Sequence, residues 1–148
     1  MIQQRFQLPI FTSLIVRKNH QILLLKRNKD KVCGGFYAFP GGGVDGNEPV
    51  TTATVREAQE EIGVTIDLKD LKFVHVFHFS RKNDVEYVNF FFEVQQWQGV
   101  PENKEPEKCD EAVWFDLDHL PEKILPSHQH VLAMIKNKIE FSEYGWSE

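Results

Sequence analysis

The sequence predicts a single α/β domain, spanning residues 1–148, whose β-sheet is mixed rather than all parallel. The chain has 148 residues, of which 41% are hydrophobic. This is enough for one domain with a sizeable core and too little for two. Strand-like apolar runs are joined by short polar turns, which favours hairpins and therefore antiparallel pairs. Two other segments carry helix signals, and hairpins and helices in one short chain indicate the α/β class.

Five apolar runs rich in β-branched and aromatic residues are predicted to be strands. The first two flank a polar turn at 18–20, and polar loops are expected at 26–35 and 98–111. The three consecutive glycines at 41–43 are expected to form a turn. The predicted strands are 10–16, 22–25, 71–79, 85–97 and 112–115.

Two segments are predicted to be helices. Pro49 suits the first turn of one helix, and Gly63 lies where a left-handed C-terminal cap belongs. Ser127 is the expected N-cap of the second helix, which would run to about Ile139. The residues expected on the apolar face of this second helix are Val131, Leu132, Ile135 and Ile139.

Charge and cysteine content exclude several classes of function. The net charge is −5, and an acidic protein repels a phosphate backbone, so binding to long nucleic acid is not expected. Residues 42–64 carry five acids against one base, so most of the acidity is local. Cys33 and Cys109 lack metal-type or CxxC spacing and are expected to be free thiols. No apolar run approaches the ~18 residues of a membrane span, and we expect a cytoplasmic protein without membrane contact.

Three carboxylates share one side of the first predicted helix. At about 100° per residue, Glu57, Glu60 and Glu61 fall within about 100° of one another. Such a face is usually only solvated. Here, however, no lysine offsets the repulsion, and a glycine-rich segment leads into the helix. Clustered carboxylates beside an exposed backbone suit a hard divalent cation such as Mg²⁺.

This segment resembles the Nudix box, G-x5-E-x7-R-E-U-x-E-E-x-G-U, in which U is an apolar residue. The preceding FYAFPGG and the later EPEKCDEAVWFDLDHLP also look like stretches typical of that family. The resemblance implies the Nudix fold, an α/β/α sandwich with a mixed β-sheet between helices. The positions that match the box are Gly42, Glu48, Arg56, Glu57, Ala58, Glu60, Glu61, Gly63 and Val64.

The resemblance implies a hydrolase that cleaves a nucleoside diphosphate linked to another group, with Mg²⁺ as cofactor and Mn²⁺ as a substitute. Family members use the first and last glutamates of the motif as the main metal ligands, which map to Glu57 and Glu61. Glu60 would be a further ligand or a base, and the backbone carbonyl of Gly41 would complete the metal sphere. By the same resemblance, Arg56 would orient the neighbouring carboxylates and pair with Glu48.

The resemblance also implies a base outside the box. In some members a glutamate lies in the loop before the Trp-Phe strand. Glu105, Glu107 and Glu111 all qualify here, and Glu107 is favoured. Tyr37, Phe39 and Trp114 are candidates to contact the nucleotide base, although aromatic residues at strand spacing are more often part of a core.

The favoured substrate is a nucleoside triphosphate, because the EPEKC run and the Trp-Phe strand are similar to a MutT-like branch. That branch releases a nucleoside monophosphate and pyrophosphate. Two alternatives stay open. One is hydrolysis of ADP-ribose, a nucleotide sugar or a dinucleotide polyphosphate, and the other is a non-catalytic nucleotide-binding module. By analogy with relatives, a homodimer is expected.

Overall fold

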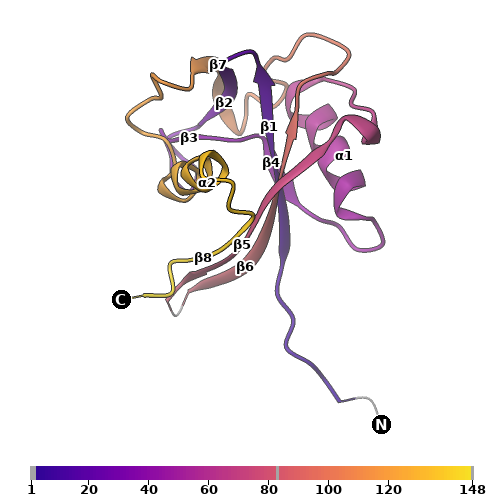
Figure 1. Ribbon diagram of the computed structural model, residues 1–148, viewed down its shortest axis with the longest axis vertical. Helices are drawn as coiled ribbons and strands as arrows, with labels where there is room; N and C mark the ends of the chain where they lie inside the picture. The colour runs from indigo at the N-terminus through magenta and orange to yellow at the C-terminus, as the bar shows by residue number, and fades with distance from the viewer. Residues whose placement is uncertain (1–2, 83, 148) are drawn as a thin grey trace.

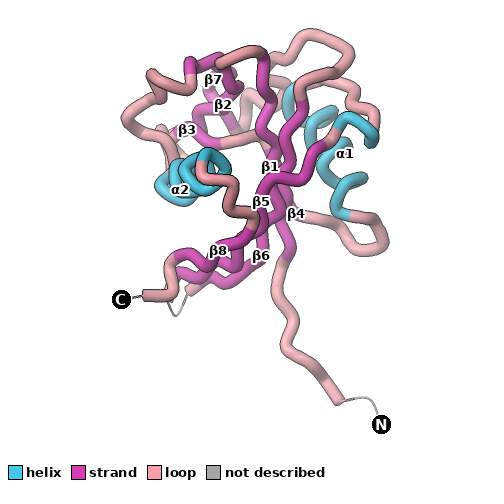
Figure 2. Tube along the Cα trace, in the orientation of Figure 1, coloured by secondary structure: helices cyan, strands magenta, loops and turns pink. Residues whose placement is uncertain are grey.

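Two helices cover opposite faces of a mixed β-sheet in the computed structural model, which describes residues 3–82 and 84–147 (Figures 1 and 2). The predicted domain of 1–148 also includes residues 1–2, 83 and 148, which lie outside the described residues. The elements are β1 (Ile10–Lys18), β2 (Gln21–Arg27), β3 (Tyr37–Ala38), β4 (Gly41–Gly43), α1 (Val50–Ile62), a short 3₁₀ helix (Leu68–Asp70), β5 (Lys72–Arg81), β6 (Val85–Val94), β7 (Cys109–Asp116), α2 (Pro126–Lys136) and β8 (Phe141–Tyr144).

The sheet combines hairpins with two parallel pairs, which confirms the prediction of a mixed sheet. Its strand order is β3-β2-β1-β6-β5-β8, with β4 paired to β1 and β7 paired to β2. The hairpins β1–β2 and β5–β6 are antiparallel, as their short polar turns predict. The pairs β1–β6 and β5–β8 are parallel. The long connection through α1 lets β1 lie beside β6 in the same direction.

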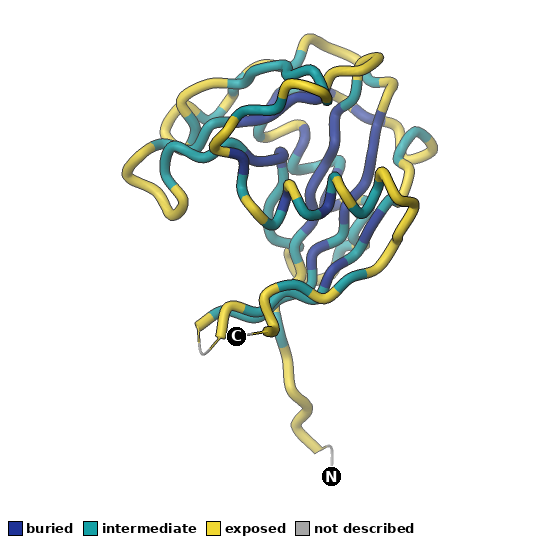
Figure 3. The backbone as a smooth tube through the Cα atoms, turned by 60° about the vertical axis from the view of Figure 1, so that its left-hand side comes forward, coloured by how far each residue is buried: buried dark blue, intermediate teal, exposed yellow. Residues whose placement is uncertain are grey.

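The backbone of β1 is buried along much of its length (Figure 3), and its apolar side chains belong to two core clusters, one on each face of the sheet. On one face, Leu14 and Val16 belong to a buried cluster with Ala58 and Ile62 of α1. On the other face, Ile15 belongs to a cluster that includes residues of α2 and the rings of β5 and β6. The α/β/α sandwich is therefore confirmed.

The last helix and its end differ from the prediction. α2 begins at Pro126, a residue whose fixed φ suits the first helical position, so Ser127 lies inside the first turn rather than at the cap. The helix ends at Lys136, and the chain turns through Lys138, which has a positive φ of 58°. Ile139 is thus outside the helix and 41% exposed, and the unpredicted strand β8 follows it.

Cys33 and Cys109 are both free thiols, as predicted. Within the described residues, no helix is long and apolar enough to cross a bilayer.

His128 of α2 is a buried histidine that is neutral in the folded protein. Its Nδ1 accepts a hydrogen bond from the backbone N–H of Phe39 at 3.1 Å, and its ring stacks on the Phe39 ring. Burial, with a smaller contribution from the charge of Arg27, lowers the pKa of His128 from 6.5 to about 3. As the pH falls below 6.5, the unfolded chain therefore binds a proton at this residue that the folded chain does not.

We expect this histidine to make the protein less stable in acid. Its contribution to the free energy of unfolding should fall by about 1.4 kcal/mol for each pH unit below the unfolded pKa. The variant His128→Gln keeps a hydrogen-bond acceptor but does not titrate. The difference in free energy of unfolding between wild type and variant, measured by urea denaturation, should narrow from pH 7 to pH 5. A free-energy difference that stays constant from pH 7 to pH 5 would contradict the lowered pKa of His128.

Candidate active site

The glycine strand β4 brings the chain into close contact with β1 just before α1 begins. Gly41 pairs with Ser13 and Gly42 pairs with Thr12 in antiparallel register. A Cβ atom at Gly41 would collide with the Thr12 carbonyl oxygen and lie 2.9 Å from the Ser13 Cα. The segment is thus a strand rather than the predicted turn, because only glycine allows this approach to β1.

Helix α1 presents its carboxylates beside this glycine strand. The Gly41 backbone N–H donates a hydrogen bond to Glu61 Oε1 at 3.1 Å. A Cβ atom at Gly42 would meet the Glu57 carboxylate, so that carboxylate lies directly over the Gly42 backbone. Glu60 is more open, with 51% of its side chain exposed against 15% for Glu57. The helix ends after this group at Gly63, whose φ of 72° gives the predicted left-handed cap.

Arg56 holds the neighbouring carboxylates in place. Its Nη2 lies 2.7 Å from Glu48 Oε1, and its Nη1 lies 3.1 Å from Glu57 Oε1. The same Nη1 lies 3.4 Å from Glu60 Oε2, and Nη2 donates to the Gly43 carbonyl oxygen at 3.2 Å. One guanidinium therefore connects the loop before α1, the glycine strand and two of the three clustered carboxylates.

Substitution of Arg56 is expected to disorder the carboxylates that it contacts. The hydrogen bonds that Arg56 donates to Glu48 lower the pKa of this carboxyl group. If these carboxylates bind a catalytic metal ion, as the resemblance to the Nudix box implies, Arg56→Gln should lower kcat by about 10- to 100-fold, the usual cost of losing a group that orients metal ligands. Arg56→Lys should recover only part of the lost kcat, because an ammonium group cannot reproduce the forked contact of the guanidinium. Steady-state kinetics of both variants test this, and a fully active Arg56→Gln enzyme would contradict it.

Glu61 and Glu57 form a pair of like charges. Burial, the hydrogen bond with Glu57 and the charge of Glu57 together raise the pKa of Glu61 to about 9, while the Gly41 N–H opposes the shift. Two carboxylates this close repel one another unless a proton or a cation lies between them. The charge of Glu105, in the loop before β7, adds to the same effect.

Two adjoining cavities begin at the glycine strand. The first, the carboxylate cavity, has a volume of about 440 Å³ and is lined by Glu57, Glu61 and the three glycines. Three cationic side chains also line it, Arg27, Lys31 and Lys108. The second, the aromatic cavity, has a volume of about 350 Å³ and is lined by aromatic rings and by the buried amide of Asn89. Phe39 and Arg27 line both cavities. The first cavity thus combines carboxylates with cations, and the second combines aromatic rings with Arg27 and Arg81.

A family model described as the NUDIX domain matches residues 8–135. The chain belongs to the Nudix family. It is 30% identical over 139 residues to an 8-oxo-dGTP diphosphatase of Escherichia coli, covering 88% of this chain and 97% of that protein. It is 34% identical over 118 residues to an ADP-ribose pyrophosphatase of Methanocaldococcus jannaschii, covering 80% and 67%. A MutT NUDIX hydrolase structure from Burkholderia pseudomallei superposes with a TM-score of 0.79 at 28% identity, covering 86% and 98%.

Family membership and these relatives identify the chain as a Nudix pyrophosphohydrolase of MutT-like type. The resemblance read from the box is thereby confirmed, and so is the hydrolase class. Two of the three clustered glutamates, Glu57 and Glu61, lie against the glycine strand.

Of the three aromatic candidates for substrate contact in this Nudix enzyme, the structure brings only Phe39 to the cavities. Tyr37 donates a hydrogen bond to Glu111 Oε1 at 2.6 Å and packs edge-on against Phe115. Trp114 stacks on Trp97 at the α1 side of the sheet. Neither Tyr37 nor Trp114 lines either cavity. Both follow the alternative interpretation, in which aromatic residues at strand spacing pack against the core.

The three candidate bases lie in different surroundings. Glu111 is bound to Tyr37, and Glu107 is exposed. Among the described residues of this loop, Glu105 is the glutamate whose charge acts on Glu61, and only 22% of its side chain is exposed. The loop at 98–111 has no periodic pattern, so its sequence does not show which of the three glutamates lies nearest to Glu61.

Arg27 is the main site residue that sequence reasoning missed. It ends β2 and lines both cavities, and its buried Nε has no hydrogen-bond partner. A buried donor without a partner is costly unless a ligand satisfies it. The available signal was a cation at the end of an apolar strand just before the polar loop, which is too common a pattern to single out one residue. Phe79, Tyr87 and Asn89 were also missed, because they lie on a hairpin far from the box in sequence.

Proposed function

We propose that this Nudix enzyme is a Mg²⁺-dependent diphosphatase of nucleoside triphosphates that releases a nucleoside monophosphate and pyrophosphate. The observation that carries the proposal is the joining of the two cavities at Arg27 and Phe39. The carboxylate cavity offers carboxylates for a metal ion and cations for the phosphates of a triphosphate. The aromatic cavity next to it suits the base of the nucleotide. The 8-oxo-dGTP diphosphatase relative, similar over 88% of this chain, supports the same substrate class.

The donor set fits a hard divalent cation. Glu57, Glu60 and Glu61 offer only carboxylate oxygens, and Gly41 adds a backbone carbonyl, which are the ligands that Mg²⁺ prefers. The Glu57 carboxylate also lies over a glycine backbone that leaves room for it. When bound, Mg²⁺ would neutralise phosphate charge and make a bound water more acidic.

The side chains of this enzyme then have separate tasks. Arg56 keeps Glu57 and Glu60 in place. The cations Arg27, Lys31 and Lys108 line the same cavity and would hold phosphate oxygens that extend beyond the carboxylates. Glu105 would accept the proton of the attacking water, because it lies on the loop that borders Glu61 and is only partly exposed.

The aromatic cavity would hold the base. Phe39 is fixed by its stack on His128, and Phe79 stacks on Tyr87 at 4.6 Å between ring centroids. The Asn89 amide is 95% buried and pairs with the Ser13 hydroxyl. An amide offers both a donor and an acceptor, so it can bind the edge of a base while the rings contact its faces.

A screen of substrates tests the proposal. The purified enzyme should hydrolyse nucleoside triphosphates, among them dGTP and 8-oxo-dGTP, in the presence of Mg²⁺, with products separated by HPLC. ADP-ribose, nucleotide sugars and dinucleotide polyphosphates belong in the same screen, because one relative is an ADP-ribose pyrophosphatase. A preference for ADP-ribose would overturn the substrate assignment. No turnover of any compound with Mg²⁺ or Mn²⁺ would favour a nucleotide-binding module.

Two loop variants test the choice of base. Glu105→Gln should lower kcat by about tenfold or more, because a positioned base contributes directly to the rate. Glu107→Gln is the matched control, since it removes an exposed charge from the same loop and should leave kcat near the wild-type value. The reverse order of the two effects, measured by steady-state kinetics, would restore Glu107 as the base.

A further inference from the structure

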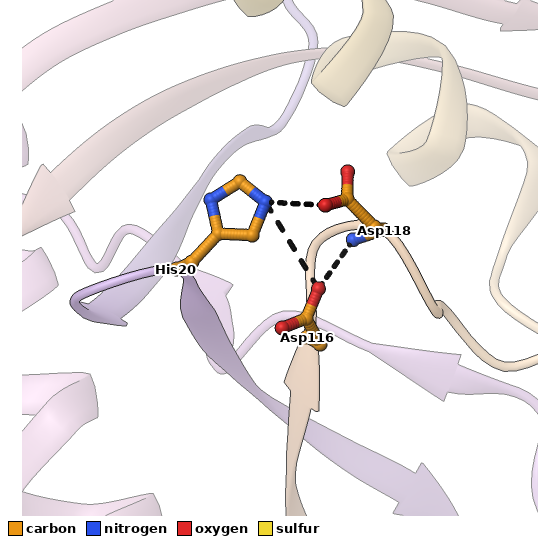
Figure 4. A group of neighbouring side chains, drawn as sticks. All are labelled: His20, Asp116 and Asp118. Carbon is orange, nitrogen blue, oxygen red and sulfur yellow. Dashed lines mark hydrogen bonds and ion pairs between the residues drawn. The ribbon is translucent and has the colours of Figure 1, made fainter.

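A group of metal-ligating side chains lies away from helix α1, where the β1–β2 turn meets the end of β7 (Figure 4). His20 comes from the turn, Asp116 is the last residue of β7, and Asp118 follows two residues later. One donor atom from each of the three lies within 4.8 Å of the others. None of these residues lines the carboxylate cavity.

The backbone fixes these three residues relative to one another. The β2–β7 ladder pairs Gln21, next to His20, with Asp116. The Leu117 N–H donates to the His20 carbonyl oxygen at 2.9 Å, which ties the turn to the end of β7. The Asp118 N–H donates to Asp116 Oδ1 at 2.8 Å and so orients that carboxylate. Strand pairing and these hydrogen bonds thus hold the backbone of the turn close to the end of β7.

Their separations match those around a tetrahedral transition-metal ion. Bonds of about 2.0–2.2 Å from Zn²⁺ to nitrogen and oxygen place neighbouring ligand atoms about 3.4 Å apart. His20 Nε2 lies 3.1 Å from Asp118 Oδ2 and 3.9 Å from Asp116 Oδ1. One imidazole and two carboxylates can supply three ligands, and water can take the fourth position.

The chemistry of this group differs from that of the glutamate cluster on α1. Imidazole nitrogen binds borderline ions such as Zn²⁺, Cu²⁺ or Ni²⁺ well, whereas Mg²⁺ prefers oxygen alone. Two carboxylates carry two negative charges, which a divalent cation balances. Access is open, because His20 and Asp118 line a cavity of about 380 Å³ on the α2 side of the sheet.

We propose that His20, Asp116 and Asp118 form a second divalent-cation site, which selects a borderline transition ion such as Zn²⁺ over Mg²⁺. The ion would join the β1–β2 turn to the connection between β7 and α2. Because the unfolded chain lacks this arrangement, binding also stabilises the fold.

Equilibrium dialysis of the full chain against Zn²⁺ in a large excess of Mg²⁺ tests the site. Magnesium occupies the oxygen ligands on α1, and bound zinc is counted by atomic emission. The wild type should retain one Zn²⁺ per chain. Asp118→Asn and His20→Gln should each weaken zinc affinity at least about tenfold, while the Glu57→Gln/Glu61→Gln double variant should retain it. Zinc binding that is absent from the wild type, or lost only in the double variant, would overturn the proposal.

Two further measurements separate a metal site from a simple ion pair. His78→Gln is the matched control, because His78 Nε2 lies 2.8 Å from a single carboxylate, that of Glu86, and should not affect zinc binding. Zn²⁺ should raise the melting temperature of the wild type but not of Asp118→Asn, whose nucleotide turnover with Mg²⁺ should be unchanged. Co²⁺ should give the intense visible absorption of a tetrahedral complex in the wild type, and its loss in His20→Gln is expected. An equal zinc-dependent rise in the melting temperature of wild type and Asp118→Asn would contradict the proposed zinc site.

Discussion

Replacing Glu57 or Glu61 by glutamine is expected to lower kcat by at least about 100-fold, because each substitution removes a charged oxygen ligand from the proposed metal site. Glutamine has nearly the same shape as glutamate, and it relieves the repulsion between these two side chains. The free energy of unfolding should therefore stay the same or rise. Steady-state kinetics over a range of Mg²⁺ concentrations, together with urea denaturation, would measure both effects.

Glu122→Gln is the matched control for this pair, since Glu122 is an exposed carboxylate outside both cavities. It should keep wild-type kcat and wild-type dependence on Mg²⁺. If Glu57→Gln or Glu61→Gln remained near wild-type activity, the metal ligands of this enzyme would lie elsewhere.

Alanine at Gly41 and at Gly42 should damage the enzyme in two different ways. At Gly42 the new Cβ would meet the Glu57 carboxylate, which lies at the end of a flexible side chain. Gly42→Ala should therefore fold but lose at least about 100-fold in kcat, because a displaced ligand costs about as much as a missing one. At Gly41 the new Cβ would meet backbone atoms of Thr12 and Ser13, which cannot move without disturbing β1. Gly41→Ala should lower the free energy of unfolding by about 2 kcal/mol or more.

Comparison of the two neighbouring variants separates site geometry from fold stability. Gly46→Ala is a suitable control, because a Cβ atom there would meet no atom within 4 Å. It should leave both kcat and the free energy of unfolding close to wild type. A Gly42→Ala enzyme with wild-type kcat would contradict the position assigned to the Glu57 carboxylate.

The elements whose burial pattern is local were predictable from the sequence. The hairpin β1–β2, the helix that ends at Gly63 and the shared face of Glu57, Glu60 and Glu61 all follow from the periodicity of their side chains. The Nudix box also predicted the fold, because its residue spacing is typical of a whole family and not only of a helix.

Features that depend on contacts between distant segments were not predictable. Gly41 to Gly43 form a strand only because β1 lies against them, and β8 exists only because β5 offers a free edge. Whether Trp114 faces a cavity or Trp97 depends on which side of β7 is covered, and one sequence does not show this. Likewise, the choice between Glu105 and Glu107 depends on the path of a loop that has no periodic pattern.

The central claim is that the carboxylates of α1 and the aromatic cavity act together on one nucleoside triphosphate. The most direct test is the product pair formed from dGTP or 8-oxo-dGTP with Mg²⁺, followed by HPLC and ³¹P NMR. We expect nucleoside monophosphate and pyrophosphate in equal amounts, and at least about 100-fold slower product formation by the Glu57→Gln variant at the same enzyme concentration. Release of nucleoside diphosphate and inorganic phosphate, or equal product formation by wild type and Glu57→Gln, would contradict the account.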